Sequence, residues 1–132
     1  MAFVVDASCL VKLFLDNAGH EAFRAWFHDA LAQGKPLHAP HLLVYETGRV
    51  IERELDDLPP SEQEELLRRA TGAFRYGWGR AGTAFEACRE HDLTYYDAAY
   101  LQVAIEETAD LVTSDKALAK AAGSLGIRVH TF

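Results

Sequence analysis

The stretch that decides the fold is residues 93–122, which read LTYYDAAYLQVAIEETADLVTSDKALAKAA. Its first half has apolar residues at helical spacing and several alanines that allow close packing on a sheet, so it predicts a helix with Asp97 in its first turn. Residues 111–113 (LVT) are an apolar run typical of a buried parallel strand, and a second helical pattern follows. Asp115 therefore comes just after the carboxyl end of a strand, where open α/β sheets bind their ligands.

The rest of the chain predicts an alternation of strands and helices around this stretch. We expect strands at residues 2–5, 37–39 and 127–132, and helices at residues 9–15, 20–33, 40–53, 61–73 and 82–91. Ser8 is a candidate cap of the first helix, Pro40 would begin the third, and Ser61 with Glu64 would form a capping box for the fourth. Residues 73–82 mix glycines with aromatic residues and predict a loop or a bent strand.

This alternation predicts an α/β fold, because strands joined by helices form right-handed crossovers. We expect one domain over residues 1–132, with a parallel, doubly wound sheet of four to five short strands flanked by helices.

The composition is that of an ordinary globular protein, with 49% hydrophobic and 25% charged residues. The net charge of −7 argues against binding nucleic acid with the whole surface, so such a substrate would need a local basic patch, a metal or both. The sequence has neither a bilayer-spanning run nor a leader pattern, so we expect a cytoplasmic protein without membrane association. Cys9 and Cys88 lie far apart and are expected to be reduced thiols.

Four carboxylates stand out because small or apolar residues surround them: Asp6, Glu46, Asp97 and Asp115. Asp6 follows the first predicted strand, and Glu46 lies within the helix at 40–53. Each has an ordinary alternative as a helix cap, a helix N-terminal charge or a solvated residue. Taken together, however, three of them are expected at one edge of the sheet, and acids with apolar neighbours are rarely buried without a partner.

Carboxylates that converge raise each other's pKa unless a cation is present. A hard divalent ion, Mg²⁺ or Mn²⁺, takes oxygen ligands and would relieve that repulsion, and it could activate water for phosphodiester hydrolysis. The six histidines are scattered, so zinc is not expected. Ser8, Thr113 and Ser114 are candidates for orienting the carboxylates, with helix capping as the alternative for Ser8 and Ser114.

Four blocks of the chain resemble the signature blocks of PIN-domain ribonucleases, most closely those of VapC-like toxins. The blocks are VVDASCLVKLFLD (4–16), LLVYETGRV (42–50), LTYYDAAYLQVA (93–104) and LVTSDKALAKAA (111–122). They occur in the family's order and span nearly the whole chain. The resemblance implies a Mg²⁺- or Mn²⁺-dependent endoribonuclease. In it the metal-binding acids would be Asp6, Glu46, Asp97 and Asp115, with Thr113 matching the family's T-x-D segment and Ser8 a polar neighbour.

The resemblance also implies partners. Such toxins are typically dimers, inhibited by a small VapB-like antitoxin that often places an arginine in the acidic pocket and so relieves the same repulsion as a metal. Promoter DNA would be bound only through the antitoxin. Residues 75–80 (RYGWGR) depart from the plain apolar strand and helix start of the family. Their rings either stack RNA bases or pack on the core or a partner chain.

Other classes of function compete with a ribonuclease. A phosphoacceptor receiver domain would need paired acids after the first strand and a lysine before a late proline, and the chain has neither. A haloacid-type phosphatase would need an acid where Ser8 stands. The third alternative is a catalytically silent PIN-fold binding module, against which the presence of all four acids speaks.

Overall fold

The computed structural model describes residues 1–78 and 84–132. In these residues five strands form one all-parallel sheet in the order β3-β2-β1-β4-β5, which confirms the predicted α/β class and parallel sheet. The strands are β1 (Phe3–Val5), β2 (Leu37–Pro40), β3 (Arg75–Gly77), β4 (Asp110–Thr113) and β5 (Val129–Thr131).

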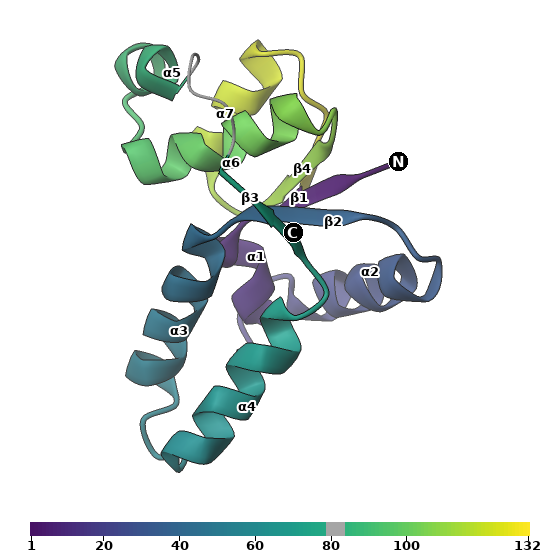
Figure 1. Ribbon diagram of the computed structural model, residues 1–132, viewed down its shortest axis with the longest axis vertical. Helices are drawn as coiled ribbons and strands as arrows, with labels where there is room; N and C mark the ends of the chain where they lie inside the picture. Colours follow the sequence, from purple (N-terminus) through teal and green to yellow (C-terminus); the bar gives the residue numbers. More distant parts are fainter. Residues whose placement is uncertain (79–83) are drawn as a thin grey trace.

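Seven α-helices and one 3-10 turn accompany these strands in the described chain. They are α1 (Ala7–Leu10), η1 (Val11–Leu13), α2 (His20–Ala32), α3 (Leu42–Glu54), α4 (Pro60–Thr71), α5 (Ala84–His91), α6 (Tyr95–Glu106) and α7 (Lys116–Ser124). The sheet is doubly wound, because α1 to α4 lie on one side of it and α5 to α7 on the other (Figure 1). None of the described helices combines the length and the apolar character needed to cross a bilayer.

The strand order changes direction between β1 and β4. From β1 the chain builds β2 and then β3 on one side, and it returns to place β4 and then β5 on the other. Val4 pairs with His38 of β2 and with Leu111 of β4, so β1 is central, and its three residues are buried. In doubly wound sheets this switch point opens a crevice at the carboxyl ends of the strands, where ligands bind.

Helix α6 lies across the central strands with its small residues inward. Ala98 and Ala104 are buried, as expected of alanines that let a helix approach a sheet closely. On the opposite side, Phe23 and Phe27 of α2 are stacked with ring centroids 5.6 Å apart and pack into the core. The two layers hold the ends of β1 and β4 in fixed positions, and these ends carry two of the candidate acids.

Three predicted helix starts are wrong. Pro40 ends β2, opposite Gly77 of β3, so α3 begins at Leu42. Ser61 lies inside α4, which begins at Pro60, because a proline is favourable in the first turn of a helix. The first helix begins at Ala7 with Asp6 as its N-cap residue, so Ser8 is not its cap.

The segment that the sequence left open contains a strand. Residues Arg75–Gly77 form β3 at the edge of the sheet, where they pair with β2. Of the predicted stretch 73–82, residues 79–82 lie outside the described residues.

Candidate active site

Asp6 and Asp115 lie at the switch point of the sheet. Asp6 directly follows β1, and its backbone N–H donates to the carbonyl oxygen of Val112 at 2.9 Å, which ties it to β4. Asp115 follows β4 two residues after Thr113. The adjacent parallel strands therefore deliver both acids to one edge, as the sequence predicts.

The Asp6 carboxylate is held by two hydroxyl groups. It is 6% exposed, and its Oδ2 accepts hydrogen bonds from Ser8 Oγ and Thr113 Oγ1, each at 2.8 Å. Its Oδ1 has no hydrogen-bond partner among residues 1–78 and 84–132. Burial raises the pKa of Asp6 most, the two hydroxyls oppose this, and the negative charges of Asp115 and Asp97 raise it further.

Thr113 and Ser8 also fasten the turn that carries Asp115. Thr113 Oγ1 accepts the Asp115 backbone N–H at 3.0 Å, and Ser8 Oγ accepts the Ser114 backbone N–H at 3.0 Å. The Thr113 hydroxyl therefore contacts both acids: it donates to the side chain of Asp6 and accepts from the backbone of Asp115. The Ser114 side chain contacts neither acid, and its Oγ donates to the Phe132 carbonyl oxygen at 2.8 Å.

Asp115 combines a capping role with a free oxygen. Its Oδ1 accepts from the backbone N–H groups of Ala117 and Leu118 at 2.9 and 3.1 Å, so it caps α7 at the helix N-terminus where the sequence alternative placed its charge. Within the described chain, Oδ2 has no hydrogen-bond partner. Capping therefore uses one oxygen and leaves the other for a ligand.

Glu46 reaches the site from α3 and is held by Tyr100 of α6. The Tyr100 hydroxyl donates to Glu46 Oε1 at 2.6 Å. Burial raises the pKa of Glu46, and the charges of Asp6 and Asp97 add to this against the effect of the Tyr100 hydrogen bond. The pKa of Tyr100 is raised as well, by its burial and by the charges of Asp6 and Glu46, so the hydroxyl stays protonated and can donate.

Tyr100 is a site residue that the sequence interpretation missed. The sequence placed it only as an apolar position of a helix. The signal was its spacing, because a residue three positions after Asp97 lies on the same face of the helix, and a buried tyrosine hydroxyl usually has a partner.

Asp97 lies in the first turn of α6, as predicted. Its backbone N–H donates to Thr94 Oγ1 at 3.1 Å, so Thr94 caps the helix. Its half-buried carboxylate makes no hydrogen bond with any residue that the structure describes. The charge of Asp97 raises the pKa of both Asp6 and Glu46, so the three carboxylates lie within electrostatic range of one another.

The four acids have the chemistry that a hard cation requires. Three of the acids accept hydrogen bonds at one carboxylate oxygen and have no partner in the described chain at the other: Asp6, Asp115 and Glu46. No described lysine or arginine lowers the pKa of Asp6 or Glu46. In the described chain no three His, Cys, Asp or Glu side chains lie close enough together to hold a metal ion by themselves. Mg²⁺ binds through one or two carboxylates and keeps several waters, so these acids could hold it without a closed set of protein ligands.

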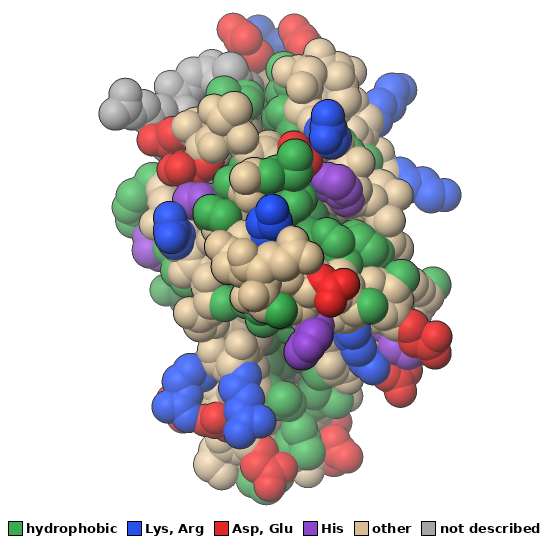
Figure 2. Space-filling view, turned by 90° about the vertical axis from the view of Figure 1, so that its right-hand side faces the viewer, with side chains coloured by type: hydrophobic (Ala, Val, Ile, Leu, Met, Phe, Trp, Pro, Cys, Tyr) green, Lys and Arg blue, Asp and Glu red, His purple; other side chains and the backbone are tan. Residues whose placement is uncertain are grey.

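The surroundings of the site are not uniformly basic. A hollow of about 420 Å³ beside Glu46 is lined by Arg49 and Arg53, which pair with Glu52 and Glu54. On the face shown in Figure 2, acidic, basic and histidine side chains are interspersed with hydrophobic patches. Nucleic acid would therefore be held by local contacts and not by a continuous basic surface on this face.

The two aromatic residues that the structure describes in 75–80 differ in exposure. Tyr76 is half-buried and packs against the core, with its ring 5.6 Å from that of His41. Trp78 is 82% exposed and contacts the His41 ring at 4.9 Å. Arg80 lies outside the described residues.

Comparisons with known proteins agree with this architecture. The model of the PIN domain family matches residues 3–124. The crystal structure of PAE2754 from Pyrobaculum aerophilum is similar, with a TM-score of 0.66 and 25% sequence identity over 92% of this chain and 87% of that chain. No curated protein matches the chain. The PIN domain is generally a nuclease fold, and its members act on RNA or DNA. The match over nearly the whole length means that the chain belongs to the PIN domain family.

Proposed function

We propose that the protein is a Mg²⁺- or Mn²⁺-dependent endoribonuclease that hydrolyses RNA phosphodiester bonds. The observation that carries the proposal is the state of Asp6. Its carboxylate is buried at the switch point, its pKa is raised by burial and by the charges of Asp115 and Asp97, and its Oδ1 has no partner in the described chain. A divalent cation relieves this unfavourable arrangement.

The acids that would hold the metal are Asp6, Asp97 and Asp115, with Glu46 beside them. A bound divalent ion supplies an activated water and stabilises negative charge on the phosphate. The chain's own contribution is orientation. Thr113 and Ser8 fix the Asp6 carboxylate, and Tyr100 fixes that of Glu46, so their free oxygens need little rearrangement to bind.

We further propose that the chain is the toxin of a VapBC-like pair, acting as a homodimer and inhibited by a cognate VapB-like antitoxin. The support is the resemblance of the four sequence blocks together with acids that no described lysine or arginine neutralises. An antitoxin arginine would supply that charge in place of the metal. Promoter DNA would be bound only through the antitoxin.

The test is cleavage of a fluorescent single-stranded RNA by the purified chain. We expect cleavage with Mg²⁺ or Mn²⁺, none with EDTA, and none by Asp6→Asn with either metal. Asp29→Asn, an exposed change on α2, is the control and should cleave normally. Equal cleavage by Asp6→Asn and the control would overturn the proposal. For the toxin role, co-expression of a small neighbouring reading frame should restore growth and yield a complex.

The second candidate function is a catalytically silent binding module. It is favoured by one observation, that the described acids do not form a three-ligand cluster by themselves. It predicts a partner complex and no metal-dependent cleavage, so the same assay separates the two functions.

A further inference from the structure

A groove of about 680 Å³ lies where β2 and β3 end and α3 and α6 begin. Five rings line it, those of His41, Tyr45, Trp78, Tyr95 and Tyr96. Trp78 is 82% exposed, Tyr45 is 75% exposed, and the ring centroids of His41 and Trp78 are 4.9 Å apart. Exposed aromatic side chains gathered in one hollow mark a binding surface, because single exposed rings are ordinary but contiguous ones are not.

The groove borders the acidic site. Tyr45 directly precedes Glu46 on α3, and Tyr96 directly precedes Asp97 on α6. Tyr45 also lines the smaller hollow that Glu46 lines. A molecule in the groove would therefore contact residues that are directly next in sequence to two acids of the proposed site.

A second, independent feature of the groove is an amide without a partner. Gln102 of α6 lines the groove and is 4% exposed, and its Nε2 has no hydrogen-bond partner among the described residues. Buried polar groups in native proteins almost always have a partner, so an exception points to a missing ligand or water. The groove thus combines exposed aromatic rings with a lining glutamine whose buried Nε2 lacks an acceptor.

We propose that this groove binds one unpaired nucleobase of the RNA substrate, next to the phosphodiester that is cleaved. The base stacks on the aromatic rings, and the Gln102 amide bonds to an acceptor on its edge. This inference rests on the proposed ribonuclease function. Every nucleobase has a π-face for stacking and nitrogen or carbonyl acceptors on its edge. Because a duplex covers the faces of its bases, the substrate is single-stranded or looped at this position.

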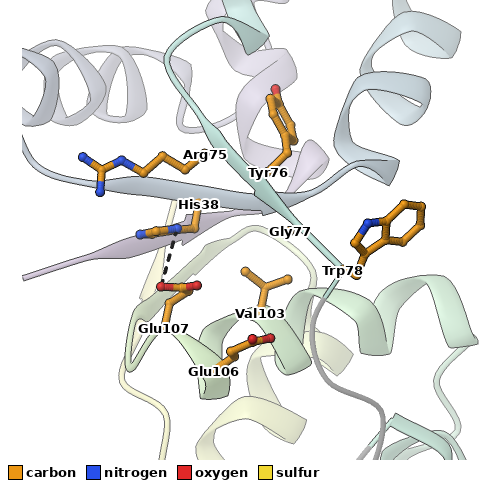
Figure 3. A pocket seen from close by; sticks show the side chains of 8 residues that line it. All are labelled: His38, Arg75, Tyr76, Gly77, Trp78, Val103, Glu106 and Glu107. Atoms are coloured by element: carbon orange, nitrogen blue, oxygen red, sulfur yellow. Dashed lines mark ion pairs between the residues drawn. The ribbon is translucent and has the colours of Figure 1, made fainter.

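A helical protein segment fits these features less well than a base. It would cover the rings, but its backbone carbonyl oxygens are already engaged within the helix, so Gln102 Nε2 would stay a desolvated donor without an acceptor. The second hollow at Trp78, of about 470 Å³, is also a poorer place for a base. There Glu107 lies 3.9 Å from His38 and adds negative charge, and the Trp78 indole is turned away from that pair (Figure 3).

The test measures RNA binding in EDTA, so that no cleavage occurs, with fluorescent RNA pentanucleotides of each of the four bases. We expect Trp78→Ala to weaken binding about 10-fold or more, the effect of losing one stacked base. Gln102→Met keeps the side-chain volume but removes the donor, so it should bind the RNA more weakly. Leu31→Ala, an exposed apolar change on α2, is the control and should bind as the unmodified chain does.

Tryptophan fluorescence distinguishes direct stacking on Trp78 from a purely structural role of this residue. RNA should quench the emission of the unmodified chain, and Trp78→Phe should lose the quenching while it keeps binding. Equal binding by Trp78→Ala, Gln102→Met and the control would overturn the inference. So would a dimer that Trp78→Ala dissociates without any effect on RNA, because the groove would then belong to a second copy.

The cleavage assay with Mn²⁺ separates this inference from the function on which it rests. If RNA is cut at equal rates by the unmodified chain and both groove variants, the base subsite is wrong and the ribonuclease stands. If binding depends on Trp78 and Gln102 but no metal supports cleavage, the ribonuclease is wrong and base binding stands.

Discussion

The carboxyl edge of the sheet has an acidic half and an aromatic half. At the ends of β1 and β4, Asp6 and Asp115 each have one oxygen bound by protein donors and one oxygen free in the described chain. At the ends of β2 and β3 the surface is aromatic, and Gln102 Nε2 is a donor without an acceptor there. The first half presents unneutralised negative charge, and the second presents exposed aromatic rings. On the proposed function, the first half would hold the cation and the second would hold a base of the substrate.

The strongest way to break this comparison is to remove a charge from the acidic half. Asp97→Asn should lower the single-turnover cleavage rate by more than about 100-fold, because charge stabilisation by a metal contributes several kcal/mol. Binding of RNA in EDTA should not weaken, since the aromatic half is unchanged. A variant that cleaves as well as Asp29→Asn would show that Asp97 takes no part in the chemistry.

The next largest effect concerns the hydroxyl that contacts both acids. Thr113→Val keeps the shape of the side chain but removes the donor to Asp6 and the acceptor for the Asp115 N–H. We expect a loss of about 10- to 100-fold in activity and in Mn²⁺ affinity, as for other residues that orient metal ligands. Thr131→Val, at the paired and exposed position of β5, is the matched control. Equal results for the two variants would contradict an orienting role.

A smaller effect is expected when Glu46 loses its donor. Tyr100→Phe should lower activity by up to about 10-fold, and it should lower the free energy of unfolding by about 1 kcal/mol, as for a lost hydrogen bond. Tyr76→Phe is the control, because its hydroxyl donates to the Thr71 carbonyl oxygen, away from the acids. Both variants should lose similar stability. If Tyr76→Phe loses as much activity, the effect of Tyr100 is structural only.

The smallest expected effect is a change in thermal stability when the Asp6 charge is removed from the acidic half. Because the pKa of Asp6 is raised in the folded state, the folded chain binds this proton more tightly than the unfolded chain. Its contribution to stability is therefore present at low pH and is lost as the pH rises through the folded-state pKa. In EDTA at neutral pH, Asp6→Asn should raise the Tm by a few degrees, and Mg²⁺ should raise the Tm of the unmodified chain only. A lower Tm for Asp6→Asn in EDTA would contradict this.

The central sheet could be predicted from the sequence because its strands carry their own signal. Residues 3–5 and 111–113 are continuous apolar runs, and burial on both faces requires them to be so. The edge strand β3 carries little signal of its own, since Arg75 and Gly77 suit a turn equally well. Its structure comes from pairing with β2, and tertiary pairing overrides local preference.

Helix starts were less predictable for a related reason. A proline suits both the end of a strand and the first turn of a helix, and Pro40 takes the former because β3 pairs beside it. Ser8 has the character of a cap, but it lies inside α1, where its hydroxyl donates a hydrogen bond to Asp6 and accepts one from the Ser114 backbone N–H.

The positions of Asp6 and Asp115 and the hydroxyl partners Ser8 and Thr113 could be predicted from the sequence, whereas the roles of two residues of α6 could not. Strand order brings Asp6 and Asp115 together, and this could be inferred from where each follows a strand. Tyr100 and Gln102 show only helical spacing in the sequence. Their roles depend on which neighbours α6 meets, namely Glu46 of α3 for the first and the aromatic groove for the second.

The most direct test of the central claim is a crystal of the protein soaked with Mn²⁺ and measured for anomalous scattering. We predict a manganese peak bound by Asp6 Oδ1 together with at least one carboxylate oxygen of Asp97, Asp115 or Glu46, and loss of the peak in Asp6→Asn. A fully occupied manganese ion elsewhere, with Asp6 uncoordinated while the protein cleaves RNA, would contradict the account.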